Sequence, residues 1–297
     1  MTELHLNRDA FRVLLIHSAE LIPENAAGKA GRLEEMIRAG SPDLVLHNGD
    51  AFSSPIPAED ARTCLGVFFA PAIRRSIPWT AAFGDGERKT GLDDGALDEL
   101  FRLSEGFLPG IRAENADGVT NGVLPVWDGS DPALILRLFD THRETTSYER
   151  EYGSPGRSRL PYPLYTHHYM DGVRFNQTAW FDGDADRLRE RYGRRIPEVL
   201  FFHTPTPEHA QNPLNQEQTG FDGVYREDSK CQTVNGGITM AAAESGTVLG
   251  IFCGHERSND YFASFAGMTL GVEPEFARGA WILEIERTGV RVRRLSV

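Results

Sequence analysis

The chain has 297 residues, of which 40% are hydrophobic and 25% are charged, and these values are typical of a soluble globular protein. A formal net charge of −12 argues against a nucleic-acid backbone as the main partner but still allows an anionic substrate. Three cysteines in no metal-binding spacing indicate a reducing compartment. We find no secretory signal and no apolar run that could cross a membrane, so the sequence predicts a cytoplasmic protein with no membrane partner.

The first third of the chain alternates between predicted strands and helices. Short apolar runs indicate buried strands, and the segments between them have helical spacing of apolar residues. In chain order we expect strands at 11–17, 43–46 and 79–83, and helices at 28–39, 58–75 and 93–103. This βαβαβ beginning predicts a mainly parallel central sheet.

The rest of the chain predicts more strands, two helices and two long polar loops. The expected strands are 119–124, 133–139, 198–202 and 248–253, followed by a terminal hairpin at 280–285 and 290–295. Helices are expected at 176–191 and 238–244, and loops at 141–171 and 214–236. There is no internal repeat and no linker, so residues 1–297 are predicted to form a single domain.

Five short polar blocks occur in a fixed order along the chain, and four of them follow a predicted buried strand. The blocks are Ile16-His17-Ser18-Ala19-Glu20, His47-Asn48-Gly49-Asp50, Phe83-Gly84-Asp85-Gly86-Glu87, Phe201-Phe202-His203 and Gly254-His255-Glu256-Arg257. Strand ends that bring Asp and His side chains to one place are how hydrolytic sites of α/β proteins are built.

The order of these blocks resembles that of the calcineurin-like metallophosphoesterases, and within them the purple-acid-phosphatase-like branch of small intracellular members. This family carries D-x-H, G-D, G-N-H-[DE], a lone His and G-H-x-H, each at a strand end. Flanking segments such as Pro42-Asp43-Leu44-Val45 and Phe202-His203-Thr204-Pro205 stand at the corresponding positions. The resemblance covers nearly the whole chain and implies a four-layer α/β/β/α sandwich.

The resemblance implies that one of the family's two metal positions is complete. Asp50 corresponds to the aspartate that bridges both ions, while Asp85, His203 and His255 correspond to the other ligands of the second ion. Asp85 replaces the family's Asn, which keeps an oxygen ligand and adds a negative charge. Two imidazoles and two carboxylates suit one divalent ion such as Zn²⁺, Mn²⁺ or Fe²⁺.

The ligands of the first metal position are replaced by Ser18, Glu20 and Arg257. A neutral serine is a poor ligand, and a guanidinium cannot bind a cation because it stays protonated. We expect Arg257 to lie beside Glu20 or Asp50 and to supply positive charge where the first ion would be. Gly86 stands where the family has its catalytic histidine, which removes the usual proton donor.

Five other histidines are expected to have no part in metal binding. Strand alternation turns His17 away from the ligand face, so His17 and His47 are expected in the core or behind the ligands. His142, and His167 and His168 in the predicted loop, are expected to have no role in the chemistry.

The leading hypothesis is a metallophosphoesterase-like hydrolase that retains one metal site, with weak or specialised activity on a small phosphorylated or other anionic substrate. Asp50 would hold the ion and Arg257 would clamp the phosphate. Two alternatives stay open. One is an inactive relative that acts as a binding module, and the other is a mononuclear-metal enzyme of different chemistry.

Overall fold

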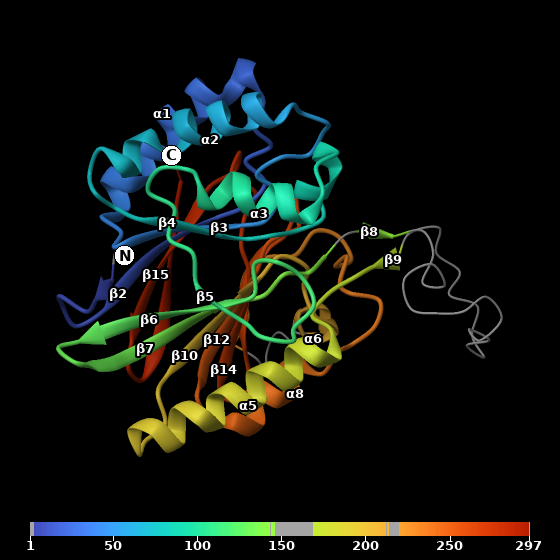
Figure 1. Cartoon of the computed structure of the whole chain (residues 1–297). Coiled ribbons are helices and arrows are strands. Elements are labelled where there is room, and N and C mark those ends of the chain that lie inside the picture. Colours follow the sequence, from blue (N-terminus) through green and yellow to red (C-terminus); the bar gives the residue numbers. More distant parts are fainter. Residues whose placement is uncertain (1–2, 143, 146–168, 212, 214–219, 297) are drawn as a thin grey trace.

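The computed structural model describes residues 3–142, 144–145, 169–211, 213 and 220–296. Two β-sheets pack face to face, and helices cover the outer face of each sheet (Figure 1). This is the four-layer α/β/β/α arrangement that the sequence predicted. None of the described helices is both long and apolar enough to span a membrane.

The smaller sheet consists of three N-terminal strands and the C-terminal hairpin. In spatial order its strands are Gly289–Leu295 (β16), Ala280–Glu286 (β15), Phe11–Ile16 (β2), Leu44–Asn48 (β3) and Trp79–Ala82 (β4). β2, β3 and β4 are parallel, whereas β15 is antiparallel to both β2 and β16. The predicted βαβαβ beginning and terminal hairpin are therefore both present.

The larger sheet is mixed rather than mainly parallel. In spatial order its strands are Leu4–His5 (β1), Gly122–Asp128 (β6), Asp131–Leu138 (β7), Glu198–Phe202 (β10), Val248–Cys253 (β12), Met268–Val272 (β14), Asp260–Phe265 (β13) and Asp222–Val224 (β11), with Ile111–Arg112 (β5) beside β6. β10 pairs in parallel with β7 and β12, while β6–β7, β13–β14 and β11–β13 are antiparallel. The sequence did not predict β13 and β14, because only part of each strand is buried and the alternation of apolar residues is weak.

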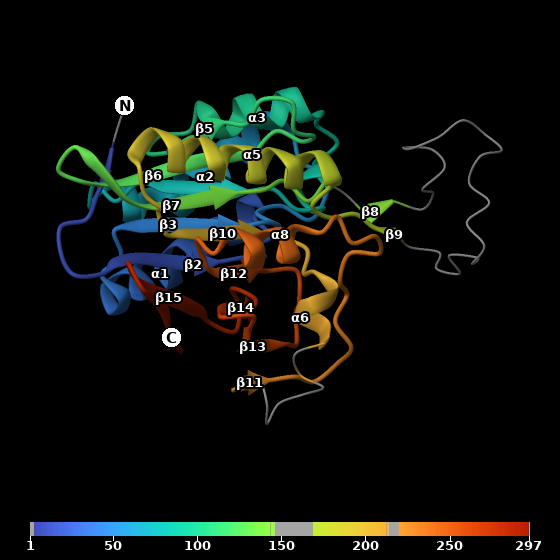
Figure 2. The same ribbon diagram turned by 90° about the horizontal axis from the view of Figure 1, so that it is seen from below.

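Helices form the two outer layers. Pro23–Gly40 (α1), Ala58–Ile73 (α2) and Asp94–Arg102 (α3) cover the smaller sheet, and Phe175–Tyr192 (α5) and Ile238–Ser245 (α8) cover the larger one. Figure 2 shows α5 and α8 over the outer face of that sheet. α1 begins five residues before its predicted start, because Pro23 occupies the first helical position, where no backbone N–H is required.

Short elements complete the described part of the chain. They are the 3₁₀ helix Glu87–Thr90 (η1), the helix Pro207–Gln211 (α6) and a two-stranded ribbon of Glu144–Thr145 (β8) and Tyr169–Met170 (β9). His167, His168 and most of the predicted loop 141–171 lie outside the described residues.

Apolar side chains fill each of the three interfaces between layers. Side chains alternate along each strand, so Leu14 packs under the helices while Val13 and Leu15 pack between the sheets. In β10, Phe201 enters the inter-sheet core and Leu200 packs under the helices of the other layer. Strands that are buried on both faces read as continuous apolar runs, which is why the sequence identified them readily.

The five polar blocks lie at the ends of five strands, namely β2, β3, β4, β10 and β12. β3 and β4 are adjacent and parallel in one sheet, and β10 and β12 are adjacent and parallel in the other. Parallel neighbours end at the same edge of a sheet, so the residues that follow these strands meet at one edge of the sandwich. Three residues at this edge, Ser18, Asp50 and His255, have φ angles of 52°, 62° and 68°. Non-glycine residues are uncommon in this region, and such strain clusters at functional sites.

Candidate metal centre

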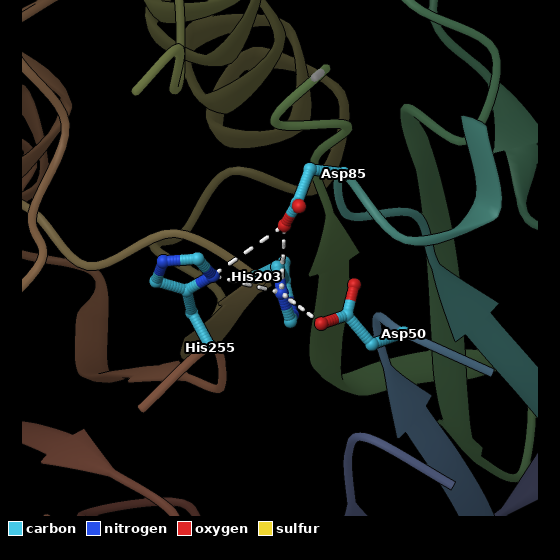
Figure 3. A group of neighbouring side chains, drawn as sticks. All are labelled: Asp50, Asp85, His203 and His255. Carbon is cyan, nitrogen blue, oxygen red and sulfur yellow. Dashed lines mark hydrogen bonds and ion pairs between the residues drawn. The ribbon is translucent and has the colours of Figure 1, made fainter. Parts of the chain in front are cut away.

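Four side chains converge at this edge of the sandwich, and each follows a different strand (Figure 3). Asp50 follows β3, Asp85 follows β4, His203 directly follows β10 and His255 follows β12. One donor atom from each residue lies within 4.8 Å of the donor atoms of the other three. The structure thus brings together the four residues that the sequence grouped as ligands.

The interatomic distances place His203 at the centre of the group. Its Nε2 atom is 3.3 Å from Asp50 Oδ2, 3.5 Å from Asp85 Oδ1 and 3.3 Å from His255 Nδ1. His255 Nδ1 is also 3.5 Å from Asp85 Oδ1. Figure 3 shows the contacts of Asp50, Asp85 and His255 meeting at the His203 ring, so the four residues form one group instead of separate pairs.

The orientation of the His203 ring is set by the backbone. Its Nδ1 atom donates to the carbonyl oxygen of Asn48 at 2.7 Å, so in the neutral ring Nε2 carries the lone pair. This lone pair points at the carboxylates of Asp50 and Asp85, and such an arrangement needs a cation between the groups. Burial lowers the pKa of His203, but the two carboxylates outweigh it and raise that pKa well above the ordinary value. Either a proton or a metal ion can supply the positive charge.

A buried polar atom without a hydrogen-bond partner supports the metal interpretation. Asp85 Oδ1, which faces the centre of the group, is buried and has no hydrogen-bond partner. Buried polar atoms are nearly always paired, so unpaired ones need an explanation such as an ion. Two carboxylates and two imidazoles match the donor set of Zn²⁺, Mn²⁺ or Fe²⁺, so the residues present fit a divalent ion.

Glu87 supports the ligand loops from behind, a role that the sequence analysis missed. Its carboxylate accepts hydrogen bonds from the backbone N–H groups of Asp50, Ala51 and Gly84 at 2.6–3.1 Å. Burial, and next the charge of Asp50, raise the pKa of Glu87 to about 7, while the backbone donors oppose that rise. The available signal was its place in the Gly84–Glu87 block, directly after the ligand turn.

Two glycines allow the close approach of these loops. A Cβ atom on Gly84 would lie 2.3 Å from His203 Cδ2. A Cβ atom on Gly86 would lie 2.3 Å from the Phe52 carbonyl oxygen and 2.4 Å from Asp50 Oδ1, to which the Gly86 N–H donates. At the position of the family's catalytic histidine, the local packing therefore leaves no room for a side chain.

The residues at the other metal position do not form a second cluster. Ser18 is buried and its Oγ atom is 2.9 Å from His17 Nδ1. Arg257 forms an ion pair with Glu20, and 58% of its side chain is exposed. Among the described residues we find no pairing of Arg257 with Asp50. The guanidinium thus lies largely exposed to solvent and not in a buried gap.

Three other histidines of the described residues, His17, His47 and His142, do not belong to this group. His17 is buried behind the ligands, with its ring centroid 6.1 Å from that of His203 and its Nε2 atom 3.1 Å from the Glu273 carbonyl oxygen. His47 packs edge-on against Phe68 and Phe69 on the helix side of its sheet. His142 contacts Gln177 at 3.3 Å.

Comparison with known families agrees with the order of the blocks and with the fold. The family model of the calcineurin-like phosphoesterases matches residues 4–257. The chain belongs to the calcineurin-like phosphoesterase family. Members of this family are metal-dependent and act on phosphorylated substrates.

Curated relatives from a plant and a yeast are about one quarter identical to this chain over the aligned residues. The probable inactive purple acid phosphatase 29 of Arabidopsis thaliana is 25% identical over 256 residues, which cover 80% of this chain and 60% of that protein. The phosphatase DCR2 of Saccharomyces cerevisiae is 26% identical over 242 residues, which cover 77% and 38%. The chain thus spans at most about 60% of the length of these relatives.

A solved structure shares the fold of this chain. A dimetal phosphatase from Danio rerio superimposes with a TM-score of 0.58 and 12% identity, and the match covers 97% of this chain and 99% of that one. At this identity the match establishes the architecture alone. The match does not determine the number of ions in the candidate metal centre, which depends on the ligand residues of this chain.

Proposed function

We propose that this phosphoesterase holds a single divalent ion through Asp50, Asp85, His203 and His255, and that it hydrolyses phosphoesters slowly or with a narrow substrate range. The convergence of these four donors, with a buried oxygen of Asp85 left without a hydrogen bond, supports the proposal most directly. Ser18, Glu20 and Arg257 leave the other position of the family's site without a complete ligand set.

Each side chain has a definite part in the proposed reaction. Asp50, Asp85, His203 and His255 would hold the ion, which would supply polarisation of a phosphoryl oxygen and a water molecule of lowered pKa. The guanidinium of Arg257, which is largely exposed and paired with Glu20, is available to donate to a phosphate oxygen. No side chain at Gly86 can deliver a proton to the leaving group, so we expect weak catalysis.

Hydrolysis of p-nitrophenyl phosphate tests this proposal. Chelated protein should be inactive, and adding Mn²⁺ or Zn²⁺ should restore a turnover well below about 10 per second, the median for enzymes. Asp50→Asn should abolish the restored activity, whereas His5→Gln, an exposed control far from the site, should not change it. Activity that survives both chelation and Asp50→Asn would refute the proposal.

A non-catalytic role is the second candidate. The specific observation in its favour is that three ligand positions and the catalytic-histidine position of the family are occupied by other residues. In addition, one relative is named a probable inactive phosphatase. In that case the protein would bind an anionic partner at the same edge without turnover. Metal content separates the candidates, because no metal favours the binding module, zinc or manganese favours the hydrolase, and iron or copper favours a redox enzyme.

A further inference from the structure

The two carboxylate oxygens of Asp85 face different partners. Oδ1 faces the imidazoles of His203 and His255 at 3.5 Å, at the centre of the candidate metal site. Oδ2 accepts a hydrogen bond from the ammonium of Lys89 at 2.5 Å. Asp85 is 5% exposed, while 46% of the Lys89 side chain is exposed. Lys89 therefore places a positive charge directly behind one ligand of the site.

The local backbone explains why Lys89 reaches Asp85. The two residues are four apart, and the turn between them tightens into η1, where the Lys89 N–H donates to the Gly86 carbonyl oxygen at 3.0 Å. Asp85 lies two residues before η1, and this turn brings the Lys89 ammonium within hydrogen-bonding distance of Asp85 Oδ2, where the opposite charges attract. The pairing is therefore built into the ligand turn itself.

The Asp85–Lys89 ion pair also changes the net charge of the candidate metal site. Asp50 and Asp85 both approach His203, so two carboxylates share a small and mostly buried volume. Without compensation such carboxylates repel each other and hold a dication more tightly. An ammonium at Oδ2 cancels one of the two charges and leaves only Oδ1 free to face an ion.

We propose that Lys89 is a positioning residue that pairs with Asp85 so that the carboxylate presents one oxygen, and little net charge, to the metal. The Asp85–Lys89 pair then acts as a neutral oxygen ligand would, which moderates metal affinity and disfavours binding through both oxygens. This inference rests on the proposed metal site and adds a determinant of its affinity and selectivity.

Removing the Lys89 ammonium should increase the affinity of the site for a divalent ion. With Gln at position 89, Asp85 regains its full charge and the repulsion between the ammonium and the dication disappears. Affinity for Mn²⁺ should then rise on the order of tenfold at low ionic strength, the size expected for coupling between contacting charges. The gain should be smaller for Zn²⁺, because larger ions accept carboxylates bound through both oxygens more readily.

A double-mutant cycle with isothermal titration of Mn²⁺ and Zn²⁺ tests the proposal. The variants are Lys89→Gln, Asp85→Asn and the double variant, with Lys89→Arg as the conservative replacement and Lys230→Gln as an exposed lysine control. Lys89→Gln should tighten Mn²⁺ binding much more when Asp85 is present than when it is combined with Asp85→Asn. Lys89→Arg and Lys230→Gln should keep the wild-type affinities and the wild-type ratio of the two metals.

Three results of the double-mutant cycle would contradict the proposed role of Lys89. If wild-type protein binds Mn²⁺ or Zn²⁺ and Lys89→Gln changes neither affinity nor their ratio, Lys89 has no positioning role although the metal site stands. If Lys89→Gln changes Mn²⁺ affinity by the same factor with and without Asp85→Asn, Lys89 does not act through Asp85. If wild-type protein binds neither metal, the proposed metal site fails, and the inference fails with it.

Discussion

The Nδ1 atom of His203 lies 2.7 Å from the carbonyl oxygen of Asn48, two residues before Asp50. This hydrogen bond links β10 of one sheet to the end of β3 in the other. It fixes which nitrogen of His203 faces Asp50 and Asp85, in the way that partners behind a metal ligand usually set its tautomer. The contact between the two sheets and the geometry of the site are therefore coupled.

Removing the His203 imidazole should strongly reduce metal binding. His203 Nε2 lies within 3.5 Å of donor atoms of all three other residues, so His203→Ala takes away the central donor. Disturbing groups behind a metal ligand commonly costs about 10- to 100-fold in affinity, and losing the ligand itself should cost at least that much. Titration calorimetry with Zn²⁺ measures the change. Unaltered affinity would remove His203 from the ligand set.

Arg257→Met should change the free energy of unfolding by less than about 1 kcal/mol, because exposed ion pairs contribute little. More than half of the Arg257 side chain is exposed, so its loss does not leave a buried charge unpaired. A guanidinium buried in place of the first ion would have implied a larger loss in the free energy of unfolding. Urea denaturation of both proteins without metal makes the comparison. A loss of several kcal/mol would indicate the buried role instead.

Gly86→Ala should destabilise the protein and disturb Asp50. The new Cβ would lie 2.3 Å from a backbone oxygen and 2.4 Å from Asp50 Oδ1, and overpacking of this kind typically costs about 1–3 kcal/mol. Gly66→Ala is the matched control, because it lies in α2 with no atom within 4 Å of the added Cβ. That control should stabilise the helix by about 0.5–1 kcal/mol. Thermal melts of both variants test the contrast, and equal melting temperatures would contradict it.

Acid should destabilise the fold partly through His209. This ring is buried, with Nδ1 2.8 Å from Thr206 Oγ1, and burial lowers its pKa from 6.5 to about 4. Between these values the unfolded chain binds a proton that the folded chain excludes. The free energy of unfolding therefore falls as the pH drops from about 6.5 to about 4, by about 3 kcal/mol at most for this group.

His209→Gln removes this titration and should flatten the pH dependence of stability in that range. His5→Gln, which changes an exposed residue, should leave the slope as it is. Urea denaturation at a series of pH values gives both slopes. The same slope in wild type and His209→Gln would show that His209 is not a source of the acid sensitivity.

Much of the architecture could be predicted because buried strands and amphipathic helices leave strong apolar patterns. The runs that became β2, β3, β10 and β12 are buried on both faces, so they stand out from their polar surroundings. The grouping of Asp50, Asp85, His203 and His255 followed from the resemblance of the polar blocks at successive strand ends to the motifs of the family. Their resemblance to a family of known fold supplied the pairing of strands that are distant in sequence.

What escaped prediction depends on contacts that leave no periodic pattern. Glu87 binds three backbone N–H groups, and its place directly after the ligand turn does not by itself distinguish such a buried side chain from an exposed one. The pairing of Lys89 with Asp85 depends on a 3₁₀ turn whose exact course is set by packing. The exposure of Arg257 is likewise a property of the assembled edge and not of the G-H-x-H pattern.

Metal content per chain tests the central claim most directly. Protein purified without added metal, then saturated with Mn²⁺ or Zn²⁺ and desalted, should contain one tightly bound ion by elemental analysis. The variant with Ser18→Asp, Glu20→His and Arg257→His restores the family's missing ligands and should move toward two. Two ions per wild-type chain at full occupancy, or none after saturation, would contradict the account of a single retained metal site.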